Sequence, residues 1–302
     1  MTTSEAEFKE YDQSQYWVAP ARNFRSSARL HLQHMLFQNT LGYLLEPVVE
    51  KSVAGSHQLR IADLACGNGV WLTDLHSSLA KTNVSAQLDG FDINPINFPD
   101  PAFLPSGVTL KQLDILAHPF PPHLKGVYDV VHIRAFCSVI NNAPALRPVL
   151  AVASELLKPG GFLQWEETRG DRFFVDCPSP QTSSVACSTI TQVLQGASQA
   201  RGISMEWVDV LDTHVNAFGF QDVRLLAQEK RKQDLKGWTE DYMMVWEEIA
   251  SFFPPKATQP NAPMSREAWV ELFANSVKET EQGVVVHQGR ILTVVGQKPL
   301  SP

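Results

Sequence analysis

The chain has 302 residues, of which 44% are hydrophobic and 19% charged, and its formal net charge is −7 at pH 7. These values are typical of a soluble globular protein, and the acidic balance argues against nucleic acid as a partner because phosphate binding needs a basic face. The four cysteines form no C-x-x-C pair, which indicates reduced thiols in a cytoplasmic protein and no zinc site.

The N-terminal stretch MTTSEAEFKEYDQSQYW is acidic and polar, unlike a signal peptide. No apolar run approaches the roughly 18 residues of a membrane span, so we expect no membrane association. Residues 22–50 carry a helical apolar stripe that stops at or near Pro47. We interpret residues 1–55 as an N-terminal helical cap segment. A helix this apolar could exchange between subunits, which leaves a homodimer open.

Strands and helices alternate from residue 59 onward. The predicted strands are LRIADLA, SAQLDGFDI, VTLKQLDI, GVYDVVHIRAF and FLQWEE, and Gly160 and Gly161 separate the last of them from the preceding helix. Helical patterns in GVWLTDLHSSLAKT and APALRPVLAVASELL lie between strands. Such alternation predicts crossover connections and a parallel sheet, so residues 56–232 are expected to form a Rossmann-like cofactor-binding core.

The last third of the chain reads less regularly. Residues 180–200 and the stretch MEWVDVLDTHVNAF are predicted helices, and DVRLLAQEKR is a predicted sixth strand. Two helical patterns around a proline-rich loop fill residues 233–285, which we interpret as a helical lid insertion. The stretch RILTVVGQK predicts a C-terminal strand, so residues 286–302 should complete the core sheet.

Two glycines follow the first predicted strand at the start of a helix. Gly67 and Gly69 would let the chain turn tightly and let a ligand approach the backbone. Asp92 ends the next strand, 23 residues after Gly69, where a carboxylate can accept hydrogen bonds from ribose hydroxyls. Trp71 stands close to where a dinucleotide motif has its third glycine. The pattern therefore favours a cofactor with a ribose but no pyrophosphate, and it disfavours a dehydrogenase.

DLACGNG resembles the first motif of the class I S-adenosylmethionine-dependent methyltransferases. The segments GFDIN, QLDIL, YDVVHIRAF and LKPGGFLQWEE resemble the motifs that follow it, over about residues 58–168. The flanking segments resemble small-molecule methyltransferases of fungal secondary metabolism. The resemblance implies a mostly parallel seven-stranded sheet with helices on both faces and a helical cap. Ala65 departs from the family glycine, and we expect its methyl group to exclude a positive φ.

The resemblance also implies a binding site for S-adenosyl-L-methionine. The residues that it places at this cofactor are Asp63, Ala65, Gly67, Gly69, Asp92, Asp114, Ile115, His132 and Arg134. Asp92 would take the ribose hydroxyls, and Asp114 the adenine amino group. Alternatives stay open, since Asp63 could cap the turn, Asp114 could be a solvated turn residue and Arg134 could form a structural ion pair.

Methyl transfer needs a base only if the acceptor must lose a proton. The candidates are His132, Glu166, Glu167 and His287. His132 and Glu166 are the catalytic candidates, and Glu167 is a candidate for substrate contact. His132 could instead be a core histidine, and both glutamates could be rim residues. His31 and His34 could share a helix face, but without a third ligand we predict no metal site.

Aromatic and apolar residues at both ends of the chain could close a lid over the cofactor. The candidates for substrate contact there are Trp17, Phe24, Met35, Tyr242 and Trp246. The alternative is that these side chains only form core between the added helices and the sheet.

The predicted function is S-adenosylmethionine-dependent methyl transfer, by in-line displacement, to O, N or S of a small, largely apolar metabolite. Two alternatives stay open. One is a regulatory or interaction protein with the methyltransferase fold. The other is a cyclase or isomerase that uses the bound cofactor without transferring its methyl group.

Overall fold

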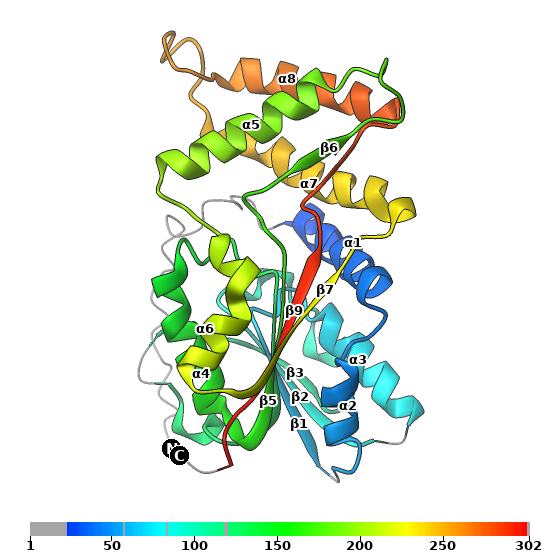
Figure 1. Ribbon diagram of the computed structural model, residues 1–302, viewed down its shortest axis with the longest axis vertical. Helices are drawn as coiled ribbons and strands as arrows, with labels where there is room; N and C mark the ends of the chain where they lie inside the picture. The colour runs from blue at the N-terminus through cyan, green and yellow to red at the C-terminus, as the bar shows by residue number, and fades with distance from the viewer. Residues whose placement is uncertain (1–22, 57, 83, 118–119, 301–302) are drawn as a thin grey trace.

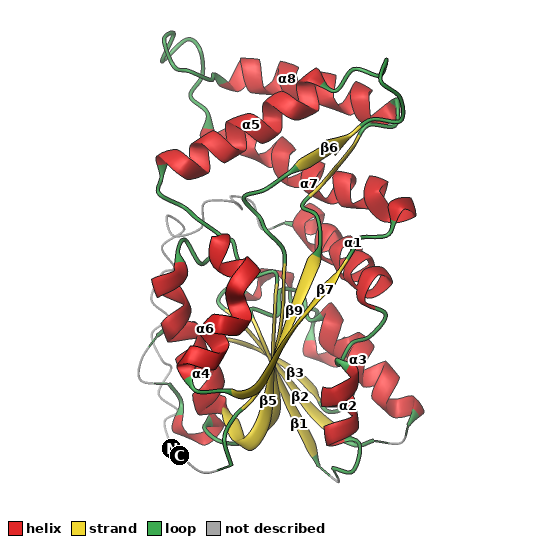
Figure 2. Ribbon diagram, in the orientation of Figure 1, coloured by secondary structure: helices red, strands yellow, loops and turns green. Residues whose placement is uncertain are grey.

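The computed structural model describes residues 23–56, 58–82, 84–117 and 120–300. A twisted sheet with helices on both faces forms the lower part of the molecule, and a helical layer lies above it (Figure 1). Figure 2 shows that strands dominate the centre of the lower part. The helices are α1 (Phe24–Leu41), α2 (Pro47–Val53), α3 (Val70–Lys81), α4 (Leu146–Leu156), α5 (Val185–Ala200), α6 (Leu211–Phe218), α7 (Leu235–Ile249) and α8 (Arg266–Glu281).

The main sheet has seven strands in the order β3-β2-β1-β4-β5-β9-β7. They are β1 (Leu59–Leu64), β2 (Ala86–Asp92), β3 (Val108–Gln112), β4 (Tyr128–Arg134), β5 (Leu157–Glu167), β7 (Gln221–Gln228) and β9 (Ile291–Gln297). Strands β1 to β5 pair in parallel, and β9 runs antiparallel to both β5 and β7. The predicted α/β fold, with its sixth and C-terminal strands, is therefore confirmed.

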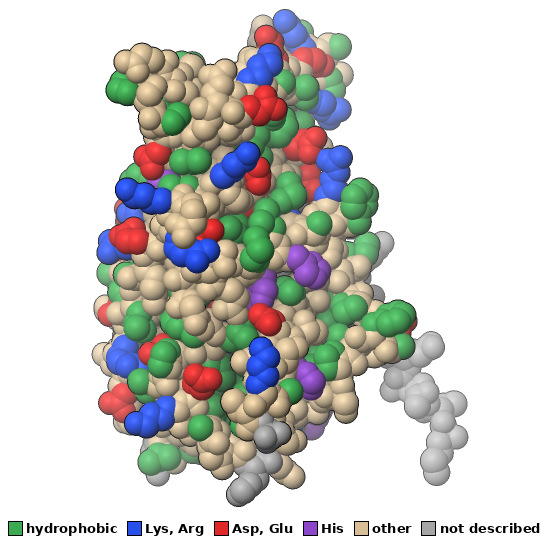
Figure 3. Space-filling view, turned by 90° about the vertical axis from the view of Figure 1, so that its right-hand side faces the viewer, with side chains coloured by type: hydrophobic (Ala, Val, Ile, Leu, Met, Phe, Trp, Pro, Cys, Tyr) green, Lys and Arg blue, Asp and Glu red, His purple; other side chains and the backbone are tan. Residues whose placement is uncertain are grey.

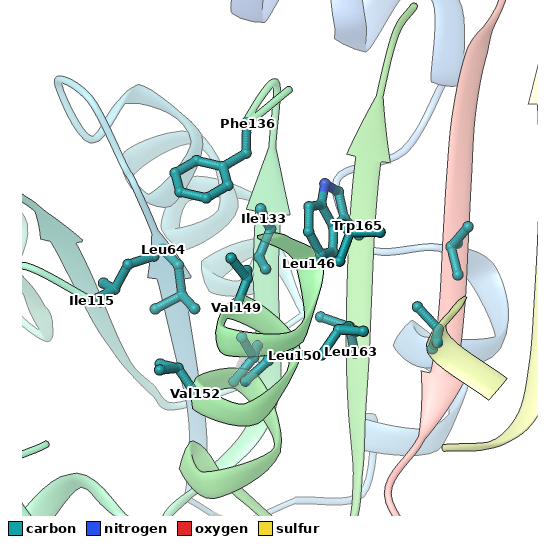
Figure 4. Packing of buried hydrophobic residues seen from close by; sticks show 14 of the residues in the cluster. Leu64, Ile115, Ile133, Phe136, Leu146, Val149, Leu150, Val152, Leu163 and Trp165 are labelled. Carbon is teal, nitrogen blue, oxygen red and sulfur yellow. The ribbon is translucent and has the colours of Figure 1, made fainter. Parts of the chain in front are cut away.

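The central strands β1, β4 and β9 are largely buried, as their nearly continuous apolar sequences predict, whereas the edge strands β3 and β7 are partly exposed. On one face α4 packs Leu146, Val149 and Leu150 against Leu64 and residues of β4 and β5 (Figure 4). On the other face, α2 and α3 pack against the opposite side of β1 and β4. The functional consequence is a rigid frame that fixes the carboxyl ends of four neighbouring parallel strands.

The boundary between α4 and β5 differs from the prediction. Helix α4 ends at Leu156, and β5 begins at Leu157 and runs through the two glycines that were expected to precede it. Gly160 has φ 79, and a Cβ on Gly161 would lie 3.1 Å from the backbone oxygen of Asp129. The glycines thus let the strand bend and approach its neighbour instead of separating helix from strand.

The upper layer is a second hydrophobic cluster to which α1, α5 and α7 contribute, with Trp238 and Trp269 among its fully buried members. A short ribbon of β6 (Phe174–Asp176) and β8 (Val285–His287) connects it to the sheet. Helix α5 packs against α8 in this layer, although it falls inside the range predicted for the core. The division at residues 55, 232 and 285 stays a prediction.

The face on which α1 and α3 lie carries acidic and basic side chains interspersed, with histidines near its middle (Figure 3). Among the described residues, no helix is both long enough and apolar enough to cross a membrane.

Candidate functional site

A cavity of about 310 Å³ lies between the sheet and the helical layer. Its floor comes from the residues that end or follow β1, β2, β4 and β5, and its walls and roof come from α1, α5 and α7. Ligands of doubly wound sheets bind at this edge, and the volume falls in the range of small-molecule sites.

The turn after β1 forms one side of the floor. Gly67 and Gly69 adopt φ values of 60 and 75, in the left-handed region that glycine enters freely. A Cβ on Gly69 would lie 2.7 Å from a methyl carbon of Leu110, so the turn packs closely against β3. Ala65 also has a positive φ of 57, which overturns the expectation that its methyl group excludes this conformation. The surrounding turn holds it there at a cost of about 1–2 kcal/mol.

Asp92 ties the second strand to this turn. Its Oδ2 accepts a hydrogen bond from the backbone N–H of Gly67 at 2.9 Å, and its Oδ1 accepts one from the backbone N–H of Asn94 at 3.0 Å. The side chain is 7% exposed and lines the cavity. The glycine turn and the carboxylate that the sequence singled out therefore form one structure.

Asp63 and His132 meet across two paired strands. They are register partners on β1 and β4, and His132 Nδ1 lies 2.7 Å from Asp63 Oδ1. On its other side, His132 Nε2 lies 3.5 Å from Glu166 Oε2. Burial opposes a charge on His132, but the two carboxylates outweigh it and raise its pKa. Both ring nitrogens face carboxylates, and an imidazole can donate a hydrogen bond from each nitrogen only when both carry protons.

Glu166 also faces a second cation. Arg134 Nε lies 3.7 Å from Glu166 Oε2, and Gln164 donates to Oε1 at 2.7 Å. Burial works against ionisation of Glu166, but His132 and Arg134 outweigh it and lower the pKa of the carboxyl group. Asp63, His132, Glu166 and Arg134 thus form a buried group of two negative and two positive charges, which we call the floor quartet.

Arg134 leads from the floor quartet to α1. Its Nη2 lies 3.2 Å from His34 Nδ1, and because a guanidinium can only donate, His34 must accept there. His34 Nε2 then donates to Asp74 at 3.0 Å. Burial and the charge of Arg134 lower the pKa of His34 to about 4, which agrees with this neutral tautomer. Within the described residues, no three His, Cys, Asp or Glu side chains are grouped to hold a metal ion.

Glu167 lies beside the cavity, enclosed by hydrogen-bond donors. Its oxygens accept from the backbone N–H groups of Phe136 at 2.8 Å and Thr168 at 3.1 Å, and from Trp165 Nε1 at 3.2 Å. Burial raises its pKa to about 7. It is not among the cavity-lining residues, so the structure gives it the role of fixing the loop after β4. Substrate contact by Glu167 stays an unsupported prediction.

Other candidates lie apart from the cavity lining. Asp114 is exposed and accepts from the backbone N–H of Leu116 in a turn, and Ile115 is buried in the core below. His287 is on β8, where its Nε2 pairs with Asp176 at 3.1 Å. The cofactor roles predicted for Asp114 and Ile115 stay predictions.

The substrate candidates separate into two groups. Tyr242 and Trp246 line the cavity from α7. Phe24 is 81% exposed and Met35 is 51% exposed, because the buried side of α1 carries other residues, so neither lies in the cavity wall. Trp17 falls outside the described residues.

Three features of the site were missed by the sequence reasoning. Trp71 stacks on His132, Arg29 pairs with Asp241 at 3.4 Å between α1 and α7, and Lys230 is buried behind Tyr242. No local pattern signals these contacts, because each joins residues from different parts of the fold.

Cys66 is buried in the cavity wall, and burial raises the pKa of its thiol, consistent with a packing role.

Comparison with known proteins gives sequence relatives in fungi. The chain is 33% identical to the methyltransferase grgD of a Penicillium species over 172 residues, which are 55% of this chain and 57% of that protein. It is 32% identical to the N-methyltransferase tcpN of Claviceps purpurea over 150 residues, which are 49% of this chain and 50% of that protein. The chain thus spans about half the length of these curated relatives. No family model matches the chain.

Among solved structures, phosphoethanolamine N-methyltransferase 2 of Haemonchus contortus aligns with 93% of this chain and 62% of its own, at 15% identity and a TM-score of 0.46. The strand order is the one expected of the Rossmann-like methyltransferase fold. In sequence, the chain is similar to fungal methyltransferases over about half of its length.

Proposed function

We propose that the protein transfers a methyl group from S-adenosyl-L-methionine to O, N or S of a small, largely apolar metabolite of fungal secondary metabolism. The observation that supports this best is that the glycine turn and Asp92 are hydrogen-bonded to each other at the cavity floor. There a carboxylate accepts from Gly67 and faces a cavity of small-molecule size. Nitrogen is the favoured acceptor atom, because one fungal relative is named an N-methyltransferase.

The residues present suit this cofactor. Asp92 offers carboxylate oxygens for ribose hydroxyls, and Asp63 offers a carboxylate for the methionine ammonium group. Arg134 brings a guanidinium to the same wall, where it can hold a carboxylate. When bound, the cofactor supplies an activated methyl group on a sulfonium. Trp71 closes the turn with an apolar ring, and no third glycine makes room there for a pyrophosphate.

The chain's own residues then have to orient the acceptor and exclude water. Holding the reacting groups in line can lower the barrier by several kcal/mol, up to about 7–11 in the best intramolecular cases. Aromatic rings of Phe173, Tyr242 and Trp246 form the apolar roof, with centroid separations of 5.7 to 6.4 Å. The floor quartet fixes Asp63, and it leaves His132 and Glu166 poorly suited to accept a further proton.

Calorimetry with S-adenosylhomocysteine tests the cofactor site. We expect micromolar binding that weakens at least tenfold, or about 1.4 kcal/mol, in Asp92→Ala. Asp100→Ala is the matched comparison, since it removes a carboxylate that is exposed and outside the cavity lining. An absence of binding to the wild-type protein would contradict the proposal and favour the regulatory alternative.

A panel of naphthol, naphthylamine and naphthalenethiol tests the reaction. The three probes share one flat shape and differ in the acceptor atom. We expect a product heavier by one CH₂ together with formation of S-adenosylhomocysteine. Fungal metabolite extracts are tested beside the probes. New products of unchanged mass in the extracts would favour the cyclase or isomerase alternative, and cofactor binding without any transfer to extracts or probes would favour the regulator.

A further inference from the structure

Lys230 is a buried lysine that is not part of the floor quartet. It is 7% exposed, and it follows β7 at the base of the helical layer. Its Nζ lies 3.9 Å from the ring centroid of Trp238 and 5.6 Å from that of Tyr242. Within the described part of the chain, Lys230 Nζ also forms a hydrogen bond with Tyr242 Oη at 2.9 Å. The ring faces favour the ammonium form, whereas burial of a lysine without a paired carboxylate favours the neutral amine, so the two effects oppose each other.

Charged groups around Lys230 are few. Asp241 on α7 raises its pKa, but Asp241 is itself engaged by Arg29 at 3.4 Å. The thiol of Cys137, in the loop after β4, stays neutral because burial raises its pKa. Burial dominates, and the pKa of Lys230 falls to about 7. The lysine can therefore exchange a proton near neutral pH.

Tyr242 connects this amine to the cavity. The tyrosine lines the cavity from α7 and is 8% exposed. Its hydroxyl meets Lys230 Nζ, and the backbone of Gln288, another cavity-lining residue, makes a second hydrogen bond to it. Tyr242 thus links the cavity wall to a buried amine that water hardly reaches.

We propose that Tyr242 and Lys230 form a proton relay, in which Tyr242 takes the proton that the methyl acceptor releases and passes its own phenolic proton to the amine of Lys230. This inference rests on the proposed methyl transfer. An O–H bond of Tyr242 breaks as an N–H bond forms on Nζ, and a new O–H bond forms with the proton of the acceptor. The acceptor atom keeps the electron pair of its former bond to hydrogen, and Lys230 becomes an ammonium that returns its proton through Tyr242 to the cavity after the product has left.

The relay supplies a proton acceptor, which the floor quartet does not offer. His132 already faces carboxylates at 2.7 and 3.5 Å, and Glu167 is held by three N–H donors. In the ammonium form Lys230 donates to Tyr242, and in the amine form the same 2.9 Å contact lets the phenol donate to nitrogen. Tyr242 is then the catalytic residue, and Lys230 acts through it.

The first experiment follows the lysines directly, by NMR on protein labelled with ¹³C at lysine Cε. We expect one lysine to titrate near pH 7 in the wild-type protein. This titration should vanish in Lys230→Met and move in Tyr242→Phe, and it should persist in Lys278→Met, which removes an exposed lysine. If all lysines stay charged up to pH about 9, the relay is excluded whether or not the protein transfers methyl groups.

The second experiment compares acceptors that keep or lose their proton before transfer. At pH about 8 naphthalenethiol is largely thiolate and naphthylamine attacks with its free lone pair, whereas naphthol has to lose its proton during transfer. We expect Tyr242→Phe and Lys230→Met to slow transfer to naphthol about 100-fold or more, and transfer to the thiolate and to naphthylamine less than about threefold. Equal losses for all three probes, or none, would overturn the relay.

The pH profile and cofactor binding separate this inference from the proposed function. With naphthol the wild-type rate should rise with pH through about 7, and the rise should be absent in Lys230→Met. S-adenosylhomocysteine should bind wild type, Tyr242→Phe and Lys230→Met within about threefold of one another. Failure of the wild-type protein to bind it would refute the proposed function, while the NMR titration would still decide whether Tyr242 and Lys230 share a proton.

Discussion

The imidazole of His132 lies flat against the indole of Trp71, with ring centroids 3.6 Å apart and ring planes inclined by 4°. An electron-rich aromatic face stabilises a cation above it. The ring that faces Asp63 and Glu166 at its edges is therefore also supported on its face. This arrangement explains how a fully buried histidine can keep a charge, and it makes His132 a positioning residue for Asp63.

Replacing His132 by Gln should destabilise the protein in a pH-dependent way. Breaking a buried charge group costs about 3–5 kcal/mol, because the partner carboxylates lose their counterion. A raised pKa means that the stabilisation is fully present below the unfolded-state pKa of 6.5 and is lost as pH rises through the folded-state pKa. Urea unfolding at several pH values should show the wild-type advantage shrinking on the alkaline side. His123→Gln, at an exposed position, should change little. A constant difference across pH would mean a neutral imidazole.

Glu167→Gln probes how the loop after β4 is held. A carboxamide presents one NH₂ group to a site in which Phe136, Thr168 and Trp165 all donate, so one donor loses its acceptor. We expect the free energy of unfolding to fall by about 1–3 kcal/mol at pH about 5.

The pH dependence of this loss has a definite sign. The pKa of Glu167 is raised to about 7, so its contribution is present below the unfolded value of 4.5 and declines as pH rises toward 7. The gap between wild type and variant should narrow over that range. Glu271→Gln, at an exposed position, should show neither effect.

Ala65→Gly should remove strain at the cofactor turn. Ala65 pays about 1–2 kcal/mol for its φ of 57, and glycine relieves this cost while adding about 0.4–1 kcal/mol of unfolded-state entropy. The net expectation is a stabilisation of up to about 1 kcal/mol in urea unfolding. Ala62→Gly, on the preceding strand β1, should instead destabilise by about 1 kcal/mol. Equal losses at both positions would mean that the turn does not strain Ala65.

Local sequence patterns were enough to predict the sheet and the floor of the site. The strand–glycine–helix pattern and Asp92 at the end of the next strand both depend on spacing along the chain, and the structure joins them through Gly67. The orientation of α1 was less predictable. Its apolar stripe is wide, and only packing against the rest of the fold decides that Phe37 is buried while Phe24 and Met35 face outward.

Contacts between distant residues could not be read from spacing at all. His132 meets Asp63 because β1 and β4 pair in one register, and a shift of one residue would have turned the ring away. Lys230 lies in the polar run EKRK, which is typical of a surface turn, yet the helical layer folds over it. Such residues become candidates only when the fold shows what surrounds them.

Gly69→Ala separates two reasons for a glycine at the turn. Gly69 and Gly42 have nearly equal φ values of 75 and 76, but only Gly69 is crowded, with Leu110 at 2.7 Å from the position of a Cβ. Both alanine variants should lose about 1–2 kcal/mol through backbone strain. Gly69→Ala should lose about 1 kcal/mol more, because the side chain of Leu110 has to move.

Gly69→Ala should also weaken S-adenosylhomocysteine binding by about threefold or more, since the displaced turn carries the Gly67 N–H that holds Asp92. Equal losses of stability and unchanged binding in calorimetry would show that backbone conformation alone accounts for the glycine.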